Sequence, residues 1–528
     1  MSRGTRIILA LVVVAAAFGW RHWQAGAPGK DTPATAASDA GKPAAQARDA
    51  TLAVTTRTRG RLQFSPCTLT GPQASGNVEA QCARLEVPEN PAAPQGRRIS
   101  LKIAWLEAGN DGGEADPVFF IAGGPGQSAT EVASAVKIGL REVLKKRDVF
   151  LVDQRGTGGS APLQCNGPDG KPLSMPEDDA EATPDLLVDY ARRCAQAIQP
   201  HADTRYYTTA EAIGDLDAVR AALGAERIDL VGVSYGTRVA QQYARRYPQH
   251  VRAVVLDGVA PNDLVVGAEF AGTFEDAIAL QAEQCRKNPA CARRFPTDTR
   301  EQLRAVMATL RQSPVQVDYR NPGTGEIEHG QVTADTVTGL AFAFSYAPQT
   351  ASLLPLVLDE AAKGRYEPLM SLAQLASRQL GGQMNRPMQW SVICAEDAPR
   401  FTPAQADDGT LLGPDVARMF FAACPVWASG KAAADFTAPW KGTVPTLLLS
   451  GQLDPVTPPR YAERVLAGLP NGRHLIAPGQ GHNVMAQGCL PKLIGQFLET
   501  GDAKALDAKC VDSLSGVPAF TSFNGWEP

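Results

Sequence analysis

The sequence predicts an α/β fold: a doubly wound, mostly parallel sheet with an inserted, mainly helical cap domain. Short apolar runs alternate with helical periods, which is the rhythm of parallel strands buried under helices on both faces. This rhythm stops after residue 261 and resumes at residue 446, which indicates an insertion. A Gly-x-Ser-x-Gly pentapeptide at residues 232–236 stands between a strand-like run and a helical period, as in a tight strand-to-helix turn.

The individual elements follow from apolar runs and periodicity. Residues 82–87 and 99–106 are expected to be early antiparallel strands. Continuously apolar runs suit buried parallel strands, and these are residues 119–122, 149–153, 228–232, 253–257 and 446–450, with a further short strand at 474–477. The clearest helix spans residues 208–223, where Thr208 and Glu211 match a capping box. The apolar residues on its buried face are Ile213, Leu216, Val219 and Leu223.

Length, charge and composition bound the kind of protein. The 528 residues exceed one ordinary domain, and a hydrophobic fraction of 44% suffices for a large core. A net charge of −4, without a cluster of Lys and Arg, provides no basic field for a polyanion. We therefore expect no nucleic-acid partner.

The N-terminus predicts export. Arg3 and Arg6 precede an apolar run at residues 7–19, which is shorter than the roughly 20 residues of a membrane-spanning helix. This pattern is typical of a secretory signal, with a small-x-small cleavage site that ends at Ala27. An uncleaved membrane anchor is the alternative, because two tryptophans and an arginine lie just before that site.

These observations divide the chain into five parts. Residues 1–27 are the signal peptide or N-terminal anchor, and residues 28–58, rich in Ala and Pro without an apolar period, are a disordered tether. Residues 59–261 are the first part of the core, 262–440 the helical cap, and 441–528 the second part of the core with the C-terminal tail. The only expected membrane contact is through the N-terminus, and the oligomeric state is left open.

Cysteine usage also favours an oxidising compartment. The chain has an even number of cysteines and no Cys-x-x-Cys pair, which argues for disulfides rather than a zinc site or a cytosolic redox centre. The spacing alone leaves their connectivity open. The ten residues are Cys67, Cys82, Cys165, Cys194, Cys285, Cys291, Cys394, Cys424, Cys489 and Cys510.

Ser234, at the centre of the pentapeptide, is the candidate nucleophile. The flanking glycines allow the strained backbone and close chain approach that such a turn needs. A serine hydroxyl attacks only when a base takes its proton and an acid orients that base, and sites of this topology order them Ser, Asp or Glu, His. Asp454 follows the strand at 446–450, and His482 lies in a loop after the strand at 474–477.

Both partners of Ser234 have alternatives. The alternative for His482 is an ordinary surface loop histidine. Asp257, at the end of the strand 253–257, is the reserve candidate for the acid, but it lies one strand earlier than the usual position.

An oxyanion hole requires two backbone N–H groups. The residue after the nucleophile, Tyr235, supplies one. The glycine-rich loop 122–128 follows the strand at 119–122, and Gly124 is the candidate for the second. The alternative for this loop is an ordinary Gly/Pro turn between strand and helix.

Four motifs resemble one family. Residues 122–126 look like the HGGPG loop of proline iminopeptidases with Ala in place of His, and residues 153–160 look like that family's DQRGxGxS segment. Together with GVSYGT at 232–237 and GxxDPVTPP at 451–459, they resemble the tripeptidyl aminopeptidase branch of secreted α/β-hydrolase exopeptidases. The resemblance covers residues 67–510.

The resemblance implies an α/β-hydrolase fold, a Ser234, Asp454 and His482 triad, and peptides cut near a free N-terminus. The missing His of HGGPG affects the shape of the oxyanion loop but not its backbone donors. No metal and no organic cofactor are expected. Members of this branch commonly have local disulfides, which here implies pairs Cys67–Cys82, Cys165–Cys194, Cys285–Cys291, Cys394–Cys424 and Cys489–Cys510.

An exopeptidase must bind a protonated α-amine, which requires a carboxylate in a partly desolvated pocket. Glu396 and Asp397 are the candidates, because an acidic pair after a cysteine resembles the cap motif of the branch. The alternative is a solvated acidic turn. Trp390 and Tyr346 are candidates for an apolar subsite, although aromatic residues in a helical cap are more often core packing.

Asp153 and Arg155 follow a strand at the same edge of the sheet. A catalytic role is conceivable for them. We expect instead a buried structural pair that stabilises the loop beside the oxyanion hole.

The function that these features favour is a secreted serine aminopeptidase that acts on peptide substrates through an acyl-enzyme. The alternative is a carboxylesterase with the same triad, for which an amine-binding carboxylate has no use. A third hypothesis is a non-catalytic binding protein on a hydrolase scaffold, and the complete Ser, Asp and His set argues against it.

Overall fold

The structure, a computed structural model, describes residues 56–71, 76–109, 116–174, 183–381, 384–402 and 409–525. The expected signal segment and nearly all of the expected tether lie outside these residues. Residues 57 and 58, assigned to the tether from the sequence, already belong to strand β1 (Arg57–Arg59). Within the described ranges, no helix is both long and apolar enough to cross a lipid bilayer.

A mixed central sheet is the framework of the described chain. Across the described ranges it has ten strands in the order β1-β2-β3-β4-β6-β5-β7-β8-β11-β12. Pairing is antiparallel from β1 to β6 and parallel from β6 to β12. The strands after β1 are β2 (Leu62–Leu69), β3 (Val78–Pro88), β4 (Arg98–Leu106), β5 (Val118–Ile121), β6 (Val149–Val152), β7 (Ile228–Val233), β8 (Val251–Asp257), β11 (Thr446–Gly451) and β12 (Gly472–Ala477).

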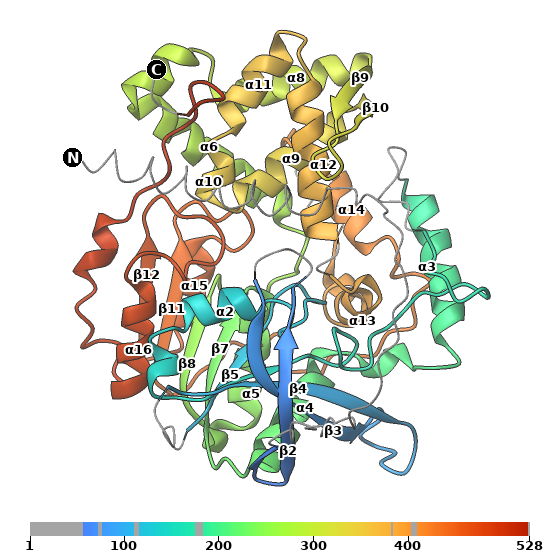
Figure 1. Ribbon diagram of the computed structural model, residues 1–528, viewed down its shortest axis with the longest axis vertical. Helices are drawn as coiled ribbons and strands as arrows, with labels where there is room; N and C mark the ends of the chain where they lie inside the picture. Colours follow the sequence, from blue (N-terminus) through green and yellow to red (C-terminus); the bar gives the residue numbers. More distant parts are fainter. Residues whose placement is uncertain are drawn as a thin grey trace, which may run out of the picture. The chain divides into compact units, whose positions relative to one another are not determined.

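Helices cover both faces of this sheet, as the doubly wound pattern predicts (Figure 1). In β5, Phe119 and Ile121 belong to one apolar cluster, and Val118 and Phe120 belong to another, because successive strand residues point to opposite faces. The first cluster includes α3, α4, α5 and α15, and the second includes α2 and α16. These helices are α2 (Ala133–Gly139), α3 (Pro184–Ile198), α4 (Thr209–Leu223), α5 (Tyr235–Arg246), α15 (Pro459–Leu466) and α16 (Leu490–Thr500).

The start of α4 shows how local sequence fixes an element. The Thr208 hydroxyl accepts a hydrogen bond from the Ala210 N–H at 3.2 Å, and the Glu211 carboxylate accepts one from the Thr208 N–H at 3.3 Å. This is the predicted capping box. It fixes the position of Thr209, the first residue of the helix, which lies buried.

The interval 262–440 is mainly helical, and its segments pack in two ways. Residues 274–376 form most of a separate apolar cluster, and Figure 1 shows their helices gathered on one side of the sheet. The hairpin β9–β10 in this segment departs from the expected absence of strands. Helix α13, in contrast, packs on the core. The elements are α6 (Phe270–Lys287), α7 (Pro289–Arg294), α8 (Thr299–Gln312), β9 (Val315–Arg320), β10 (Ile327–Val332), α9 (Ala334–Ser345), α10 (Pro348–Ala351), α11 (Leu354–Ala362), α12 (Glu367–Gly381), α13 (Arg386–Glu396) and α14 (Asp415–Phe421).

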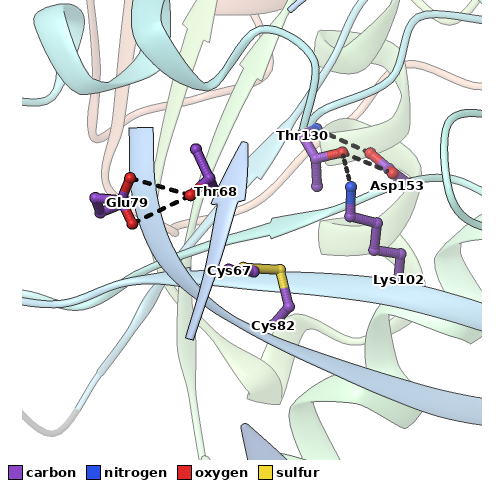
Figure 2. Close-up of a disulfide and its surroundings, with 7 residues drawn as sticks. All are labelled: Cys67, Thr68, Glu79, Cys82, Lys102, Thr130 and Asp153. Carbon is purple, nitrogen blue, oxygen red and sulfur yellow. Dashed lines mark hydrogen bonds between the residues drawn. A yellow bond between two sulfur atoms is a disulfide. The ribbon is translucent and has the colours of Figure 1, made fainter. Parts of the chain in front are cut away.

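All ten cysteines lie in the described residues, and each is paired. The bond between Cys67 and Cys82 joins β2 to β3 (Figure 2). The pairs are those that the resemblance implies: Cys67–Cys82, Cys165–Cys194, Cys285–Cys291, Cys394–Cys424 and Cys489–Cys510. Such usage is typical of proteins that mature in an oxidising compartment.

Candidate active site

Ser234 joins β7 to α5 in a strained conformation. Its φ of 54° and ψ of −125° are unusual for a residue with a side chain. The Ser234 N–H donates to the carbonyl oxygen of Asp257 at 2.8 Å. The carbonyl oxygen of Ser234 accepts from the N–H and the hydroxyl of Thr237 at 2.9 and 2.6 Å. These bonds hold the turn, which places Ser234 at the carboxyl edge of the parallel strands.

The two glycines of the pentapeptide are required by close chain approach. A Cβ on Gly232 would lie 2.5 Å from the carbonyl oxygen of Gly236. A Cβ on Gly236 would lie 2.3 Å from the carbonyl oxygen of Ile121 in β5. A side chain at either position would therefore force α5 away from the sheet.

His482 and Asp454 form a buried pair. His482 Nδ1 lies 2.7 Å from Asp454 Oδ2. The carboxylate also accepts bonds from the N–H of Val456 at 2.9 Å and from the N–H and hydroxyl of Thr457, both at 2.8 Å. Four donors thus fix the carboxylate, and because Nδ1 faces it, Nε2 is the ring nitrogen that remains to accept a proton.

Burial and charge act in opposite directions on this pair. Burial lowers the pKa of His482, but the charges of Asp454 and Asp257 outweigh it and hold the pKa above its ordinary value. Burial raises the pKa of Asp454, yet His482 and the amide donors bring it below its ordinary value. The carboxylate therefore stays ionised while the imidazole titrates, as an acid–base group requires.

Asp257 links the serine turn to the histidine loop. Its carbonyl oxygen accepts from Ser234, and its carboxylate accepts from the N–H groups of Val484 at 2.9 Å and Met485 at 2.8 Å. A Cβ on the next residue, a glycine, would lie 3.0 Å from His482 Cε1. The turn that carries Ser234 and the loop that carries His482 thus both lie against the end of β8. Burial raises the pKa of Asp257 to about 6, and its hydrogen bonds serve the loop backbone, whereas Asp454 is the carboxylate bonded to the imidazole.

The glycine-rich loop after β5 lies directly against the serine turn. A Cβ on Gly123 would lie 3.0 Å from the Cβ of Ser234. Gly124 has a φ of 109°, which strains any other residue. The start of α13 holds this loop, because the Asn385 N–H donates to the carbonyl of Gly126 at 2.9 Å. The candidate oxyanion donors, the amides of Gly124 and of the residue after Ser234, thus belong to segments that contact each other at the nucleophile.

Glu396, at the end of α13, is buried against α4. Its carboxylate accepts from the N–H of Thr209 at 2.8 Å and from the hydroxyl of Thr209 at 2.9 Å. That hydroxyl lies 2.6 Å from the phenol oxygen of Tyr235, so two hydrogen bonds separate Glu396 from the residue after the nucleophile. Burial raises the pKa of Glu396 to about 8, since the charge of nearby Arg238 offsets only part of the effect.

Glu396 also lines a cavity of about 710 Å³ between α4, α5 and residues 432–436. Ser234 and His482 are not among the residues that line it. The carboxylate therefore faces Thr209 and this cavity in the present conformation, and its binding of a substrate amine stays a prediction.

Asp397 is engaged in a structural ion pair. Both of its oxygens lie 3.1 Å from Nη1 of Arg238 on α5, and it accepts further bonds from the Val266 N–H at 3.1 Å and from Arg400 at 3.0 Å. The solvated-turn alternative is wrong for both acids, because Glu396 is 2% exposed and Asp397 is fully buried. The partners of Asp397 join α13 to α5, and its binding of a substrate amine stays a prediction.

The two candidate aromatic residues have different settings. Trp390 is buried, and its ring packs edge-on to Trp427 and Tyr190, so it is core packing. Tyr346, at the end of α9, lies with its ring edge-on to His482 at 5.4 Å between centroids. Only Tyr346 of this pair therefore contacts a candidate catalytic residue.

Asp153 and Arg155 are buried, as expected, but they do not pair with each other. Asp153 accepts from the Ser128 hydroxyl at 2.8 Å and from the Thr130 N–H and hydroxyl at 2.8 and 2.9 Å, and Figure 2 shows the bonds to Thr130. Arg155 instead holds Asp215 of α4 through two bonds of 2.7 Å. The expected single pair is thus wrong: Asp153 bonds to the loop after β5, and Arg155 bonds to α4.

Sequence reasoning missed three residues of the site network. Thr457 follows Asp454 by three residues, a spacing typical of side chains that bond to the local backbone, and this signal was available. Arg238, on the buried face of α5, indicates a buried anionic partner without identifying it. Thr209 carries no signal beyond its place after the predicted cap. Among the described residues, no group of three or more His, Cys, Asp or Glu side chains is arranged to hold a metal ion.

Comparison with known proteins agrees with this architecture. A family model for the alpha/beta hydrolase fold matches residues 116–488. Serine protease Hip1 of Mycobacterium tuberculosis (strain ATCC 25618 / H37Rv) is 28% identical over 491 residues, covering 85% of this chain and 91% of the relative. The tripeptidyl aminopeptidase of Streptomyces lividans is 31% identical over 232 residues, covering 40% of this chain and 41% of the relative.

A solved proline iminopeptidase of Mycobacterium smegmatis aligns with 80% of this chain and 100% of its own, at 16% identity and a TM-score of 0.35. The chain belongs to the α/β hydrolase family. Within it, the chain is a serine hydrolase.

Proposed function

We propose that this hydrolase is an exported serine aminopeptidase that cleaves peptide bonds near a free N-terminus, of the tripeptidyl or prolyl aminopeptidase type. The observation that carries the proposal is the buried bond between His482 and Asp454 at the edge of the sheet where Ser234 stands. The peptidase assignment is supported by the relative named serine protease, which aligns with most of the chain, and by the four sequence motifs.

The proposed reaction proceeds through an acyl-enzyme. His482 Nε2 takes the Ser234 hydroxyl proton while the oxygen attacks the scissile carbonyl carbon, and the amides of Tyr235 and Gly124 stabilise the oxyanion. His482 then donates its proton to the leaving amine as the C–N bond breaks. A water molecule repeats the cycle, which releases the acid and restores Ser234. The ionised Asp454 stabilises the imidazolium at each step, so no cofactor is needed.

Recognition of the free N-terminus is proposed for Glu396. Its raised pKa reflects a buried carboxylate without a dedicated cation, since the nearby Arg238 is bonded to Asp397. Its two donors are the N–H and the hydroxyl of Thr209. Rotation of the Glu396 side chain would therefore release both donors and let the carboxylate accept from an ammonium group instead. An ammonium ion here would also bring the pKa of Glu396 down and restore its charge.

A panel of peptide p-nitroanilides of one to three residues, each with a free or an acetylated N-terminus, tests the proposal against p-nitrophenyl esters. We expect kcat/KM to favour free N-termini by about 30-fold or more, since a charge-assisted bond in a buried site is lost on acetylation. Glu396→Gln should remove that preference, and its effect should vanish on acetylated peptides. Equal cleavage of free and blocked peptides would exclude the aminopeptidase, and hydrolysis of esters alone would favour the carboxylesterase.

Export is proposed from the N-terminal sequence and the disulfides. The basic, apolar and small-residue pattern of residues 1–27 supports a signal, and the paired cysteines support an oxidising destination. N-terminal sequencing of the protein recovered from the cell exterior or envelope tests it. A start near residue 28 would fit the cleaved signal, whereas a start at residue 1 would fit the anchor.

A further inference from the structure

The cap holds the catalytic histidine loop through a backbone contact. The N–H of His482 donates to the carbonyl oxygen of Tyr346 at 2.7 Å. A Cβ on the preceding residue, Gly481, would lie 2.2 Å from the same oxygen. The loop and the end of α9 therefore touch backbone to backbone, and the contact is possible only because residue 481 lacks a side chain.

The side chain of Tyr346 adds a second contact. Its ring stands edge-on to the imidazole of His482, with an interplanar angle of 83°. The imidazole is thus held by Asp454 at Nδ1 and by a ring from the cap. Phe342, one turn earlier on α9, packs edge-on to Tyr346 at 5.4 Å and continues into the aromatic packing of the cap.

The charged groups around His482 come from the core. Asp454 follows β11, and Asp257 ends β8; both raise the pKa of the imidazole. Tyr346 is the group that the cap contributes, and burial raises the pKa of its phenol, so it is neutral at physiological pH. Its ring therefore acts on His482 by packing and by excluding water rather than by charge.

We infer that Tyr346 is a positioning residue for His482, so that the cap must be seated on the core before the base is aligned with Ser234. The inference rests on the proposed function only in taking His482 as the base. It adds that the domain expected to recognise the substrate also controls the catalytic histidine. A substrate that seats the cap would thereby complete the site, which is a form of induced fit.

Removal of the ring has a consequence that general loss of stability does not share. Burial lowers the pKa of His482, so opening the space beside the imidazole to water should raise that pKa further. A base that needs its neutral form then loses activity at a higher pH than in the wild type. A misplacement of the base by about 1 Å should also lower kcat by about 100-fold.

The experiment compares Tyr346→Ala, Tyr346→Phe and the matched control Phe344→Ala, which removes a buried ring of the cap cluster from the same helix. The substrate is p-nitrophenyl acetate, and kcat and kcat/KM are followed across the acidic limb of the pH profile. Tyr346→Ala should lower kcat about 100-fold and move the acidic limb to higher pH. Tyr346→Phe should restore both, and Phe344→Ala should leave the acidic limb in place even where it lowers thermal stability.

A second pair of variants approaches the contact from the loop and remains available if Tyr346→Ala does not fold. Gly481→Ala places a methyl group against the Tyr346 carbonyl and should slow the labelling of Ser234 by a fluorophosphonate about 100-fold. Gly339→Ala, on exposed helix α9 surface with nothing within 4 Å of the new methyl, should label at the wild-type rate.

The inference is overturned if Tyr346→Ala keeps the wild-type acidic limb and kcat, if its pH profile coincides with that of Phe344→Ala, or if folded Gly481→Ala labels at the wild-type rate. These outcomes are separable from failure of the proposed function. Ester hydrolysis and fluorophosphonate labelling report on His482 without a peptide substrate. A wild-type protein that cleaves esters but no peptide would contradict the proposed aminopeptidase function, while the role of Tyr346 could still be tested with the ester.

Discussion

At the scale of single residues, the charge of Asp454 sets both the orientation and the pKa of His482. Four donors hold the carboxylate, and its pKa lies below the ordinary value for Asp. It therefore remains charged through the range in which the imidazole titrates. The activity of the wild type should therefore fall as the pH drops through the raised pKa of His482.

Asp454→Asn tests this coupling. Removing the charge that raises the pKa of His482 should move the acidic limb of kcat/KM to lower pH, while kcat drops by about 10³ to 10⁴ because the imidazole loses its tautomer and its counter-charge. The pH profile on a nitroanilide or an ester gives both quantities. A limb that stays in place would point to another titrating group. Asp257→Asn is the comparison, since that carboxylate also raises the pKa of His482 but is not bonded to its ring.

Glu396 makes the stability of the fold depend on pH. Its pKa is raised by burial from an ordinary 4.5 to about 8, so the folded state binds its proton more tightly than the unfolded chain does. The stabilisation is complete below the unfolded pKa and is lost as the pH rises through the folded value.

We therefore expect Glu396→Gln to flatten the decline in the free energy of unfolding between pH 4.5 and about 8. Urea unfolding at several pH values, for the wild type and the variant, measures the difference between them. If the free energies of unfolding of the two proteins change in parallel across that window, Glu396 is ionised in the folded protein and its pKa is not raised.

At the scale of elements, a buried ion pair joins α5, the helix after the nucleophile, to α13 of the cap interval. Arg238 and Asp397 are both fully buried, and among the described residues Asp397 is the one carboxylate in an ion pair with Arg238. Removing one partner of such a pair is far more costly than replacing both by apolar residues of similar size.

Arg238→Met should lower the free energy of unfolding by about 3 kcal/mol or more, because Asp397 keeps only Arg400 and one backbone amide as partners. The double variant Arg238→Met with Asp397→Leu should cost less than the sum of the single changes. A double-mutant cycle in urea gives this coupling energy directly. Additive losses would mean that the two side chains contribute independently.

Helix α5 and its surroundings show what local sequence predicts and what it does not. The strand β7, the turn at Ser234 and the helix α5 could be predicted, because an apolar run, two glycines and a helical period are adjacent in the chain. The partner of Arg238 could not, because 159 residues separate it from Asp397. The hairpin β9–β10 was missed because most of its side chains are exposed or half-buried, so apolar runs do not mark it.

At the scale of the whole described molecule, the C-terminal tail connects the core to the cap. The Gln480 side chain, two residues before His482, donates to the carbonyl of Ser515 at 2.7 Å. Farther along, the Phe520 N–H donates to the carbonyl of Ser352 at 2.9 Å, and its ring joins an apolar cluster of the cap. Figure 1 shows this red segment running from the side of α16 to the cap helices.

Phe520→Ala should therefore loosen the cap and lower the melting temperature by several degrees, because a partly buried ring is removed at the junction. Phe523→Ala, in the same tail but 58% exposed, is the matched control and should melt with the wild type. Differential scanning calorimetry distinguishes them. Coincident melting of all three proteins would show that the tail does not fasten the cap.

The Ser, Asp and His candidates also separate what local sequence predicts from what only the folded chain shows. Their order and strand-end positions could be read from the sequence, since the carboxyl ends of parallel strands lie at one edge of a sheet. The contact of Tyr346 with His482 depends on how the cap folds back on the core. No local pattern encodes that packing.

Treatment of the purified protein with a fluorophosphonate, followed by peptide mapping in a mass spectrometer, tests whether Ser234 is the nucleophile and His482 its base. We expect one modified residue, Ser234, with loss of all hydrolysis. Folded Ser234→Ala should not be labelled, and folded His482→Ala should be labelled far more slowly than the wild type. Labelling at another residue, or wild-type hydrolysis by folded Ser234→Ala, would contradict this assignment.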